Sequence, residues 1–434
     1  MQSSRHFGYF AVSQRNSAGT PMARGCALRR RRRRCDGAAA AGVVQLPATD
    51  AGAARRARNH ALQLTQAWAQ THTPRCNVAR VQLLGSAQGR ARGRNLLWTL
   101  NFCFSCPVSR TQSAKYVPPT SLIVALDWTP NANHVGFYVA AARGLYVARG
   151  LAVSFRLSEA DNYALVPAKA VLRGEAHLAV GPSETAIANA TGAEAQLVAV
   201  ATLLQHDTSA IAALASSDVA RPRDLDGRTY TSYAARFELA TVRAMIRADD
   251  GRGELTEVVP PRLACFEEVL AGRAVATWIF SPHEGVQAAA AGVPLRAFRP
   301  TDYGVPYGYS PVLLAAPALL AAKPAALRAF LAASAEGFAA AAAEPRAAAD
   351  ALRAEARHAS LADAKFARAS VAAAAPAFLD AAGAWGRMQP QRWEDFIAFL
   401  EREGLLVDRG CAPLPPAHRP TASRISTNDF LPPG

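Results

Sequence analysis

Residues 123–131 read Ile-Val-Ala-Leu-Asp-Trp-Thr-Pro-Asn, an apolar run followed at once by polar residues and a proline. The same order returns as His-Leu-Ala-Val-Gly-Pro-Ser-Glu at 177–184 and as Ala-Thr-Trp-Ile-Phe-Ser-Pro-His-Glu at 276–284. Proline suits the first turn of a helix, where its missing N–H would have no partner. Each stretch therefore predicts a strand that passes directly into a helix. Such junctions gather at the ligand-binding edge of an open α/β sheet.

The elements between residues 120 and 316 alternate in the same way, which predicts an α/β fold with parallel sheets covered by helices. The first predicted strand is 122–126, and Thr129 is the expected N-cap of the next helix. A turn at 221–228 begins the pattern a second time, so we expect two α/β lobes. Four glycines follow predicted helices and are typical stop signals. They are Gly144, Gly174, Gly272 and Gly292.

Composition and the order of predicted strands and helices together divide the chain into five parts. Residues 1–115 form an Arg-rich segment that we expect to be disordered or targeting. Residues 116–217 are assigned to the first part of lobe 1, and 218–307 to lobe 2. Residues 308–412 are expected to return to lobe 1 and to continue into Ala-rich helices, and 413–434 form a tail. The expected core anchors of the Ala-rich region are Phe330, Leu331, Phe338, Leu352, Phe366, Phe378, Trp393, Phe396 and Phe399.

The net charge of +15 is confined to one end of the chain. Residues 1–115 hold 19 of the 48 Lys and Arg and only two of the 33 acidic residues, Asp36 and Asp50, which leaves 29 bases and 31 acids for the rest. The body therefore lacks the electrostatic pattern of a nucleic-acid-binding protein. We expect no nucleic-acid partner.

An uninterrupted run of arginines at 29–34, with few acidic residues around it, resembles an organellar transit peptide. A disordered tail and a translated upstream sequence are the alternatives. No secretory signal and no transmembrane segment are evident, so a cytoplasmic or organellar location is expected. Cys103 and Cys106 form a lone C-x-x-C, which is weak evidence for a metal site, and no metal is predicted.

Several ordered motifs carry a resemblance that covers residues 122 to about 432. They include LDWTPNANH at 126–134, GPSET at 181–185, SYAARFE at 232–238 and YGVPYGYSP at 303–311. In this order the motifs resemble the SsuA-type/thiamine-pyrimidine synthase family, which includes thiamine-repressed fungal proteins and bacterial formylaminopyrimidine-binding proteins. The resemblance implies a type II periplasmic-binding-protein fold, with two lobes, a hinge and C-terminal helices.

The candidate ligand-binding residues in the first lobe follow its strands. Trp128 would stack on a flat heterocycle, an interaction worth about 1 kcal/mol beyond buried area. Asn131 and His134 would donate hydrogen bonds near a helix start, although a helix cap and a structural histidine are the simpler alternatives. Tyr138, one turn after His134, shares its helix face. The remaining candidates at the next junction are Ser183 and Glu184.

A carboxylate at a helix start is favoured by the helix dipole alone, but Glu184 could also accept hydrogen bonds from an aminopyrimidine. Glu284 occupies the matching position in the second lobe, after Trp278 on the preceding strand. Arg236 follows small residues whose N–H groups are accessible, a combination that suits a phosphate or a carboxylate. The other candidates are Tyr233, Phe237 and, at the predicted hinge, Tyr307.

Whether the chain is an enzyme depends on two positions. The resemblance implies that the fungal synthases use a histidine as a source of pyrimidine atoms and a lysine that holds pyridoxal phosphate. In our alignment Gly181 stands at the lysine position and Thr185 at the histidine position, and no cysteine occurs near the family's iron-associated stretch at 307–311. A Schiff base needs an amine, so catalytic residues are left unassigned and no cofactor is expected.

Three functions remain open. The first is a thiamine-pathway protein that binds hydroxymethylpyrimidine or formylaminopyrimidine between its lobes. The second is a pyrimidine synthase that uses pyridoxal phosphate and iron. The third is a binding protein for a sulfonate or another small anion. A small heterocycle, with or without a phosphate, is the expected partner, and the oligomeric state is left open, a dimer included.

Overall fold

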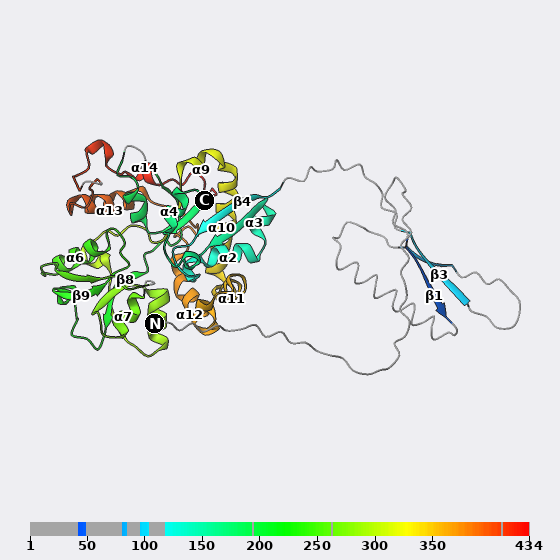
Figure 1. Ribbon diagram of the computed structural model, residues 1–434, viewed down its shortest axis with the longest axis horizontal. Helices are drawn as coiled ribbons and strands as arrows, with labels where there is room; N and C mark the ends of the chain where they lie inside the picture. Colours follow the sequence, from blue (N-terminus) through cyan, green and yellow to red (C-terminus); the bar gives the residue numbers. More distant parts are fainter. Residues whose placement is uncertain are drawn as a thin grey trace, which may run out of the picture. The chain divides into compact units, whose positions relative to one another are not determined.

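The computed structural model describes strands at 42–48, 80–84 and 96–103, and describes residues 118–192, 195–261, 264–408 and 411–433 with their side chains. The chain separates into two compact units, 1–115 and 116–434 (Figure 1). In the first, β1 (Gly42–Ala48) and β2 (Arg80–Leu84) flank β3 (Leu96–Cys103) in an antiparallel sheet. The expectation that 1–115 is a disordered or targeting segment stays a prediction, and the arginine run on which the targeting hypothesis rests lies outside the described residues.

The second unit is built on two five-stranded sheets. The first sheet has the order β5-β4-β6-β13-β7. Its strands are β4 (Thr120–Ala125), β5 (Leu151–Arg156), β6 (Leu178–Gly181), β7 (Val198–Thr202) and β13 (Val312–Ala315). Strand β4 is parallel to β5 and β6, but β13 is antiparallel to β6 and β7. The sheet is therefore mixed, because the chain returns to it from the second lobe in the opposite direction.

The second sheet has the order β10-β9-β11-β8-β12. Its strands are β8 (Ser209–Leu214), β9 (Arg228–Thr231), β10 (Leu255–Val258), β11 (Ala276–Phe280) and β12 (Leu295–Phe298). Strand β8 is antiparallel to β11 and β12, so this sheet is mixed as well. The expected lobe boundary at 217/218 is wrong, because β8 already belongs to the second sheet. The first crossing between lobes lies within 203–208.

Short helices cover both sheets. The helices of the first lobe are α2 (Val135–Ala142), α3 (Leu145–Ala148), α4 (Pro167–Leu172) and α5 (Ser183–Ala188). Those of the second are α6 (Glu238–Ala248), α7 (Cys265–Leu270) and α8 (Val286–Ala290). The four predicted stop glycines all have positive φ angles, between 67° and 73°. The expected N-cap at Thr129 is wrong: Asn131 caps the 3-10 turn η1 (Ala132–His134), its Oδ1 accepting the N–H of Asn133 at 2.9 Å.

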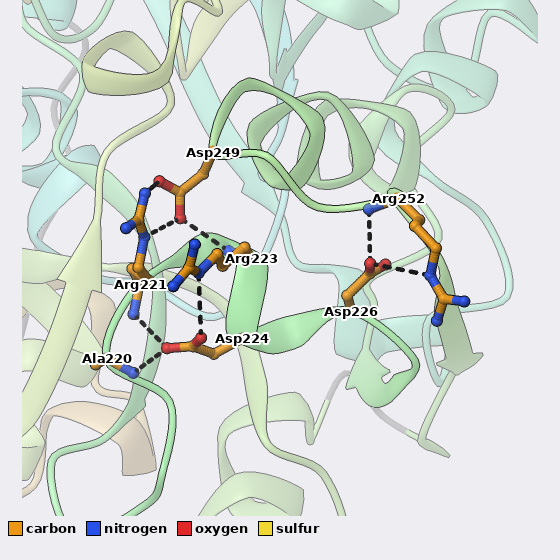
Figure 2. A network of polar contacts seen from close by, with 7 residues as sticks. All are labelled: Ala220, Arg221, Arg223, Asp224, Asp226, Asp249 and Arg252. Atoms are coloured by element: carbon orange, nitrogen blue, oxygen red, sulfur yellow. Dashed lines mark hydrogen bonds and ion pairs between the residues drawn. The ribbon is translucent and has the colours of Figure 1, made fainter.

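Charged side chains fix the turn that opens the second lobe after β8 (Figure 2). Asp249, at the end of α6, forms an ion pair with Arg221 and accepts the N–H of Arg223 at 3.0 Å. Asp226 accepts the N–H of Arg252 at 2.6 Å, so the two ends of the α6–β10 connection are tied to the same turn. This network secures the C-terminal end of α6, whose N-terminal end reaches the cavity described below.

The C-terminal helices pack on the first lobe and extend toward the second. They are α9 (Pro317–Ala322), α10 (Pro324–Ala343), α11 (Pro345–Ala356), α12 (Ala364–Ala374), α13 (Pro390–Arg402) and α14 (Ala422–Ile425). All predicted core anchors are buried except Phe366, which is half-buried. The tail also joins the core, because Ile425 and Leu431 are buried and Ser426 forms a parallel β-bridge with Ala199 of β7.

Helix α10 is, among the described helices, the one long and apolar enough to cross a membrane. Length and composition are weak evidence in a single case, because a helix buried in a protein core passes the same test. Phe330, Leu331 and Phe338 of α10 are fully buried, and α10 packs against α2 at the closest approach of Gly136 and Gly337. The sequence analysis predicted no transmembrane segment, whereas α10 meets the criterion of length and composition.

Candidate functional site

A cavity of about 180 Å³ lies between the two sheets of the second unit. Its walls come from the loop after β4, the start of α5, the loop before α6, the end of β11 and the hinge segment after residue 304. A cavity of about 150 Å³ is enough to hold a benzene ring, so this one accommodates a six-membered heterocycle with small substituents. The lining residues are Asp127, Trp128, Asn131, Asn133, Pro182, Glu184, Tyr233, Ala235, Glu238, Trp278, Phe280, Glu284, Tyr307 and Ser310.

Four of these residues are acidic. Glu184, Glu238 and Glu284 are 2–3% exposed, and Asp127 is half-buried. No residue that lines the cavity in the described part of the chain is a lysine or an arginine. The cavity therefore carries aromatic surface and carboxyl groups without a cation to neutralise them, which favours a ligand that donates hydrogen bonds or carries positive charge.

Glu184 has a carboxyl oxygen that none of the described residues pairs. It lies in the first turn of α5, and its carboxyl group is hydrogen-bonded to the Tyr307 side chain. Its Oε1 is buried and has no hydrogen-bond partner among the described residues. Burial, with the nearby Glu238 carboxyl as a second cause, raises the pKa of Glu184 to about 8. An unsatisfied buried acceptor on a residue that lines a cavity is a natural partner for a ligand's N–H group.

Glu238 holds the loop between β9 and α6 in place. It accepts the hydroxyl hydrogen of Tyr230 at 2.8 Å and the N–H groups of Tyr233 and Ala235 at 3.0 and 3.4 Å. Burial raises the pKa of Glu238 to about 7. These contacts set the position of Tyr233 at the cavity wall, and they use acceptor capacity that a ligand would otherwise occupy.

Glu284 belongs to the π-helical turn η5 (Ser281–Gly285) that follows β11. Its Oε2 accepts the N–H of Phe280 at 2.8 Å, which orients the carboxyl group toward the end of the strand. Burial raises the pKa of Glu284 to about 7. Glu184 and Glu284 thus stand at matching strand-to-helix junctions of the two sheets, as the repeated pattern predicts, and both line the same cavity.

The aromatic walls come from both lobes and the hinge. Tyr307 is buried with its ring 5.1 Å from that of Trp278 and 5.2 Å from that of Phe396, between ring centroids. Trp128 is half-buried and contacts the ring of His283, across the lobes, at 4.7 Å. Such rings offer flat surfaces on which a heterocycle stacks.

Seven of the twelve candidates from the sequence line the cavity: Trp128, Asn131, Glu184, Tyr233, Trp278, Glu284 and Tyr307. Two others support it from behind. His134 is fully buried, and its Nε2 lies 2.8 Å from Asp127 Oδ1, so it orients a lining carboxyl. Ser183 Oγ accepts the N–H of Tyr309 at 3.1 Å and ties α5 to the hinge.

Three candidates do not face the cavity. Tyr138 packs in the core with its ring 4.7 Å from that of Phe155. Phe237 is buried ahead of α6, and Arg236 is exposed, with its Nη2 donating to the Val407 carbonyl at 3.2 Å. Arg236 therefore binds the backbone at Val407 and does not reach the cavity, where the sequence analysis expected it to bind a phosphate or a carboxylate.

The sequence missed Asp127, Asn133, Pro182, Ala235, Glu238, Phe280 and Ser310. Asp127, Pro182 and Phe280 lie inside the three quoted junctions, so a consistent use of that pattern would have included them. Glu238 carried a weaker signal, an acidic residue at the first position of a helix. Among the described residues, no three Asp, Glu, His or Cys side chains are grouped to hold a metal ion.

The residues of the cavity do not fit pyridoxal phosphate held as a Schiff base. A lysine amine is required, and none of the lining residues of the described chain supplies one. Arg299 and Arg392 line a separate cavity of about 480 Å³ beyond Tyr307, together with Asp207 and Asp395. In the aromatic cavity the phosphate of that cofactor would meet carboxyl groups, and no lysine or arginine among the lining residues that the structure describes.

The two mixed sheets joined by hinge crossings define a periplasmic-binding-protein fold, which solved structures share. A protein of Bordetella bronchiseptica RB50 superposes with a TM-score of 0.54 at 14% identity, over 73% of this chain and 97% of that one. The alkanesulfonate-binding protein SsuA of Xanthomonas axonopodis pv. citri gives 0.53 at 13% identity, over 70% and 99%. At these identities the likeness concerns the fold alone.

The sequence profile of the NMT1/THI5-like family matches residues 131–348, half of the chain. The chain belongs to this family. A formylaminopyrimidine-binding protein of Halalkalibacterium halodurans is 27% identical over 217 residues, which are 49% of this chain and 63% of that protein. The match therefore spans less than two thirds of that relative. The sequence-based assignments of family and fold are confirmed.

Proposed function

We propose that this protein binds an amino-substituted pyrimidine of the thiamine pathway, of the hydroxymethylpyrimidine or formylaminopyrimidine type, between its two lobes. The observation that carries the proposal is the composition of the cavity: among the described residues, its lining has aromatic walls, four acidic side chains and no lysine or arginine. An aminopyrimidine stacks through its ring and donates hydrogen bonds through its amino group, which matches both features. The name of the Halalkalibacterium halodurans relative supports the same ligand class.

The alternatives fit this cavity less well. A sulfonate needs cationic or N–H donors, and a negatively charged group beside Glu184, Glu238 and Glu284 would be repelled once these are ionised. The same electrostatics disfavour a phosphorylated pyrimidine. A synthase that holds pyridoxal phosphate needs a lysine, and the described lining of this cavity contains none, so binding without that chemistry is the function we propose.

The proposal is tested by fluorescence titration of the full-length protein with hydroxymethylpyrimidine, formylaminopyrimidine, an alkanesulfonate and pyridoxal phosphate. We expect saturable binding of a pyrimidine and none of the sulfonate. Trp128→Ala should weaken pyrimidine binding at least tenfold, because it removes the stacking surface. Arg236→Ala is the matched control, since this residue lies outside the cavity, and it should leave Kd unchanged.

Two results would overturn the proposal. One is sulfonate binding with no pyrimidine binding, which would place an anion in the cavity. The other is a visible absorbance band of a Schiff base with pyridoxal phosphate, which would indicate a reactive lysine and a synthase.

A further inference from the structure

His283 lies beside the cavity, where a turn of the second lobe contacts the first lobe. It lies in η5, directly before Glu284, and its ring is held between two aromatic rings. The ring of Trp128 lies 4.7 Å away at an angle of 63°, and that of Phe366, from α12, lies 5.2 Å away at 90°. Because edge-to-face contacts from two sides fix the imidazole plane, the directions of its nitrogen atoms are set before any ligand enters.

The Nδ1 atom of His283 is buried and has no hydrogen-bond partner among the described residues. Buried polar atoms are nearly always paired, and an unpaired one costs free energy. Burial also lowers the pKa of His283 to about 4, so the ring is neutral at pH 7. A neutral imidazole has one donor and one acceptor nitrogen, so Nδ1 serves in either role, depending on the tautomer.

A small void of about 10 Å³ lies against this histidine. It shares Trp128, Asn131, Asn133 and Phe280 with the main cavity, so the void lies directly beside that cavity. A void of this size holds about one water molecule or a group of similar size. A ring stacked on Trp128 would therefore bring a short substituent next to His283.

We propose that His283 is a specificity-determining residue, whose Nδ1 forms a hydrogen bond with a short polar substituent on the bound ring, such as a hydroxymethyl group. The inference rests on the proposed function and narrows its ligand class. A ligand of this kind would pair the unpartnered atom of Glu184 in the cavity and that of His283 beside the void: its amino group donates to Glu184 Oε1, and its substituent bonds to His283 Nδ1. A methyl group in the same place leaves Nδ1 unpaired.

The test compares two pyrimidines that differ by one oxygen atom, 4-amino-5-hydroxymethyl-2-methylpyrimidine and 4-amino-2,5-dimethylpyrimidine, by calorimetry with the full-length protein. Wild type should bind the hydroxymethyl compound about tenfold more tightly. His283→Phe should bind the two with equal Kd, because its ring keeps the aromatic contacts but has no nitrogen. His283→Leu makes the same comparison if the Phe ring does not fit.

His283→Asn is the conservative control, because its amide places a polar atom close to the position of Nδ1, and it should keep part of the preference. Equal binding of the two compounds by wild type would overturn this inference alone, as would an unchanged preference in both His283→Phe and His283→Leu. Failure of wild type to bind either compound would instead overturn the proposed function, and this inference with it.

Discussion

At the scale of single residues, the site is defined by carboxyl groups held in an apolar setting. Glu238 is paired with hydroxyl and N–H donors, and Glu284 with the Phe280 N–H. Glu184, which lines the cavity, has one buried oxygen without a hydrogen-bond partner in the described part of the chain. The three glutamates therefore have different roles. Glu238 positions a loop, Glu284 accepts a hydrogen bond at the end of a strand, and Glu184 has an oxygen that can accept a hydrogen bond from a ligand.

The raised pKa of Glu184 predicts how stability depends on pH. Its pKa is about 8 in the folded protein against 4.5 for an ordinary glutamate, so the folded state holds the proton more tightly. Stability is then highest at low pH within this range and is lost as pH rises from about 4.5 to about 8. Glu184→Gln has no carboxyl group to ionise at this position. Its free energy of unfolding relative to wild type should therefore rise by on the order of 2 kcal/mol as the pH increases from 5 to 8.

Urea unfolding of both proteins at pH 5, 6.5 and 8 measures the effect, with Glu355→Gln on the exposed surface of α11 as the matched control. The control should show the same difference from wild type at each pH. A Glu184→Gln difference that does not vary with pH would contradict a raised pKa at this position.

At the scale of elements, the sequence predicted local structure better than its assembly. Glycines and prolines mark helix ends through backbone geometry alone, so each of the four predicted stop glycines follows a helix and has a positive φ angle. The sheet that a strand joins depends on distant partners, which is why β8 was assigned to the wrong lobe. For the same reason Tyr138 was placed on a cavity wall, although its helix face turns toward Phe155 in the core.

For the site, too, the sequence predicted the features set by local structure and missed those set by distant contacts. The strand-to-helix pattern identified Trp128, Glu184 and Glu284 because such junctions gather at one sheet edge. The direction of side chains in loops is set by contacts that no local pattern encodes. Arg236 turns to the Val407 carbonyl, while Glu238 turns inward to donors on the same loop.

The contact between α2 and α10 provides a prediction for an element pair. A methyl group at Gly337 would overlap the carbonyl group of Gly136 on the facing helix. Alanine normally favours a helix over glycine by up to about 1 kcal/mol, but overpacking of a close contact costs about 1–3 kcal/mol. Gly337→Ala should therefore destabilise the protein in urea unfolding.

The matched control is Gly192→Ala, where an added methyl group would meet open space. It should leave the unfolding midpoint within a few tenths of a kcal/mol of wild type. An increase in stability for Gly337→Ala would show that the two helices lie further apart than described.

At the scale of the whole second unit, one cavity draws its walls from both sheets and from the hinge. Helix α12 also contacts η5 and α8, so the first lobe reaches the second close to His283. A ligand that contacts both lobes stabilises the arrangement in which they enclose it. The fold thus explains why the ligand-binding candidates are spread over more than 170 residues of the chain, from Trp128 to Tyr307.

The most direct test of the central claim is calorimetric titration of the full-length wild-type protein with hydroxymethylpyrimidine and, in parallel, with an alkanesulfonate. A cavity whose described lining has aromatic walls, four acidic side chains and no lysine or arginine predicts saturable one-to-one heat with the pyrimidine and no heat of binding with the sulfonate. Saturable binding of the sulfonate, with none of the pyrimidine, would contradict the account.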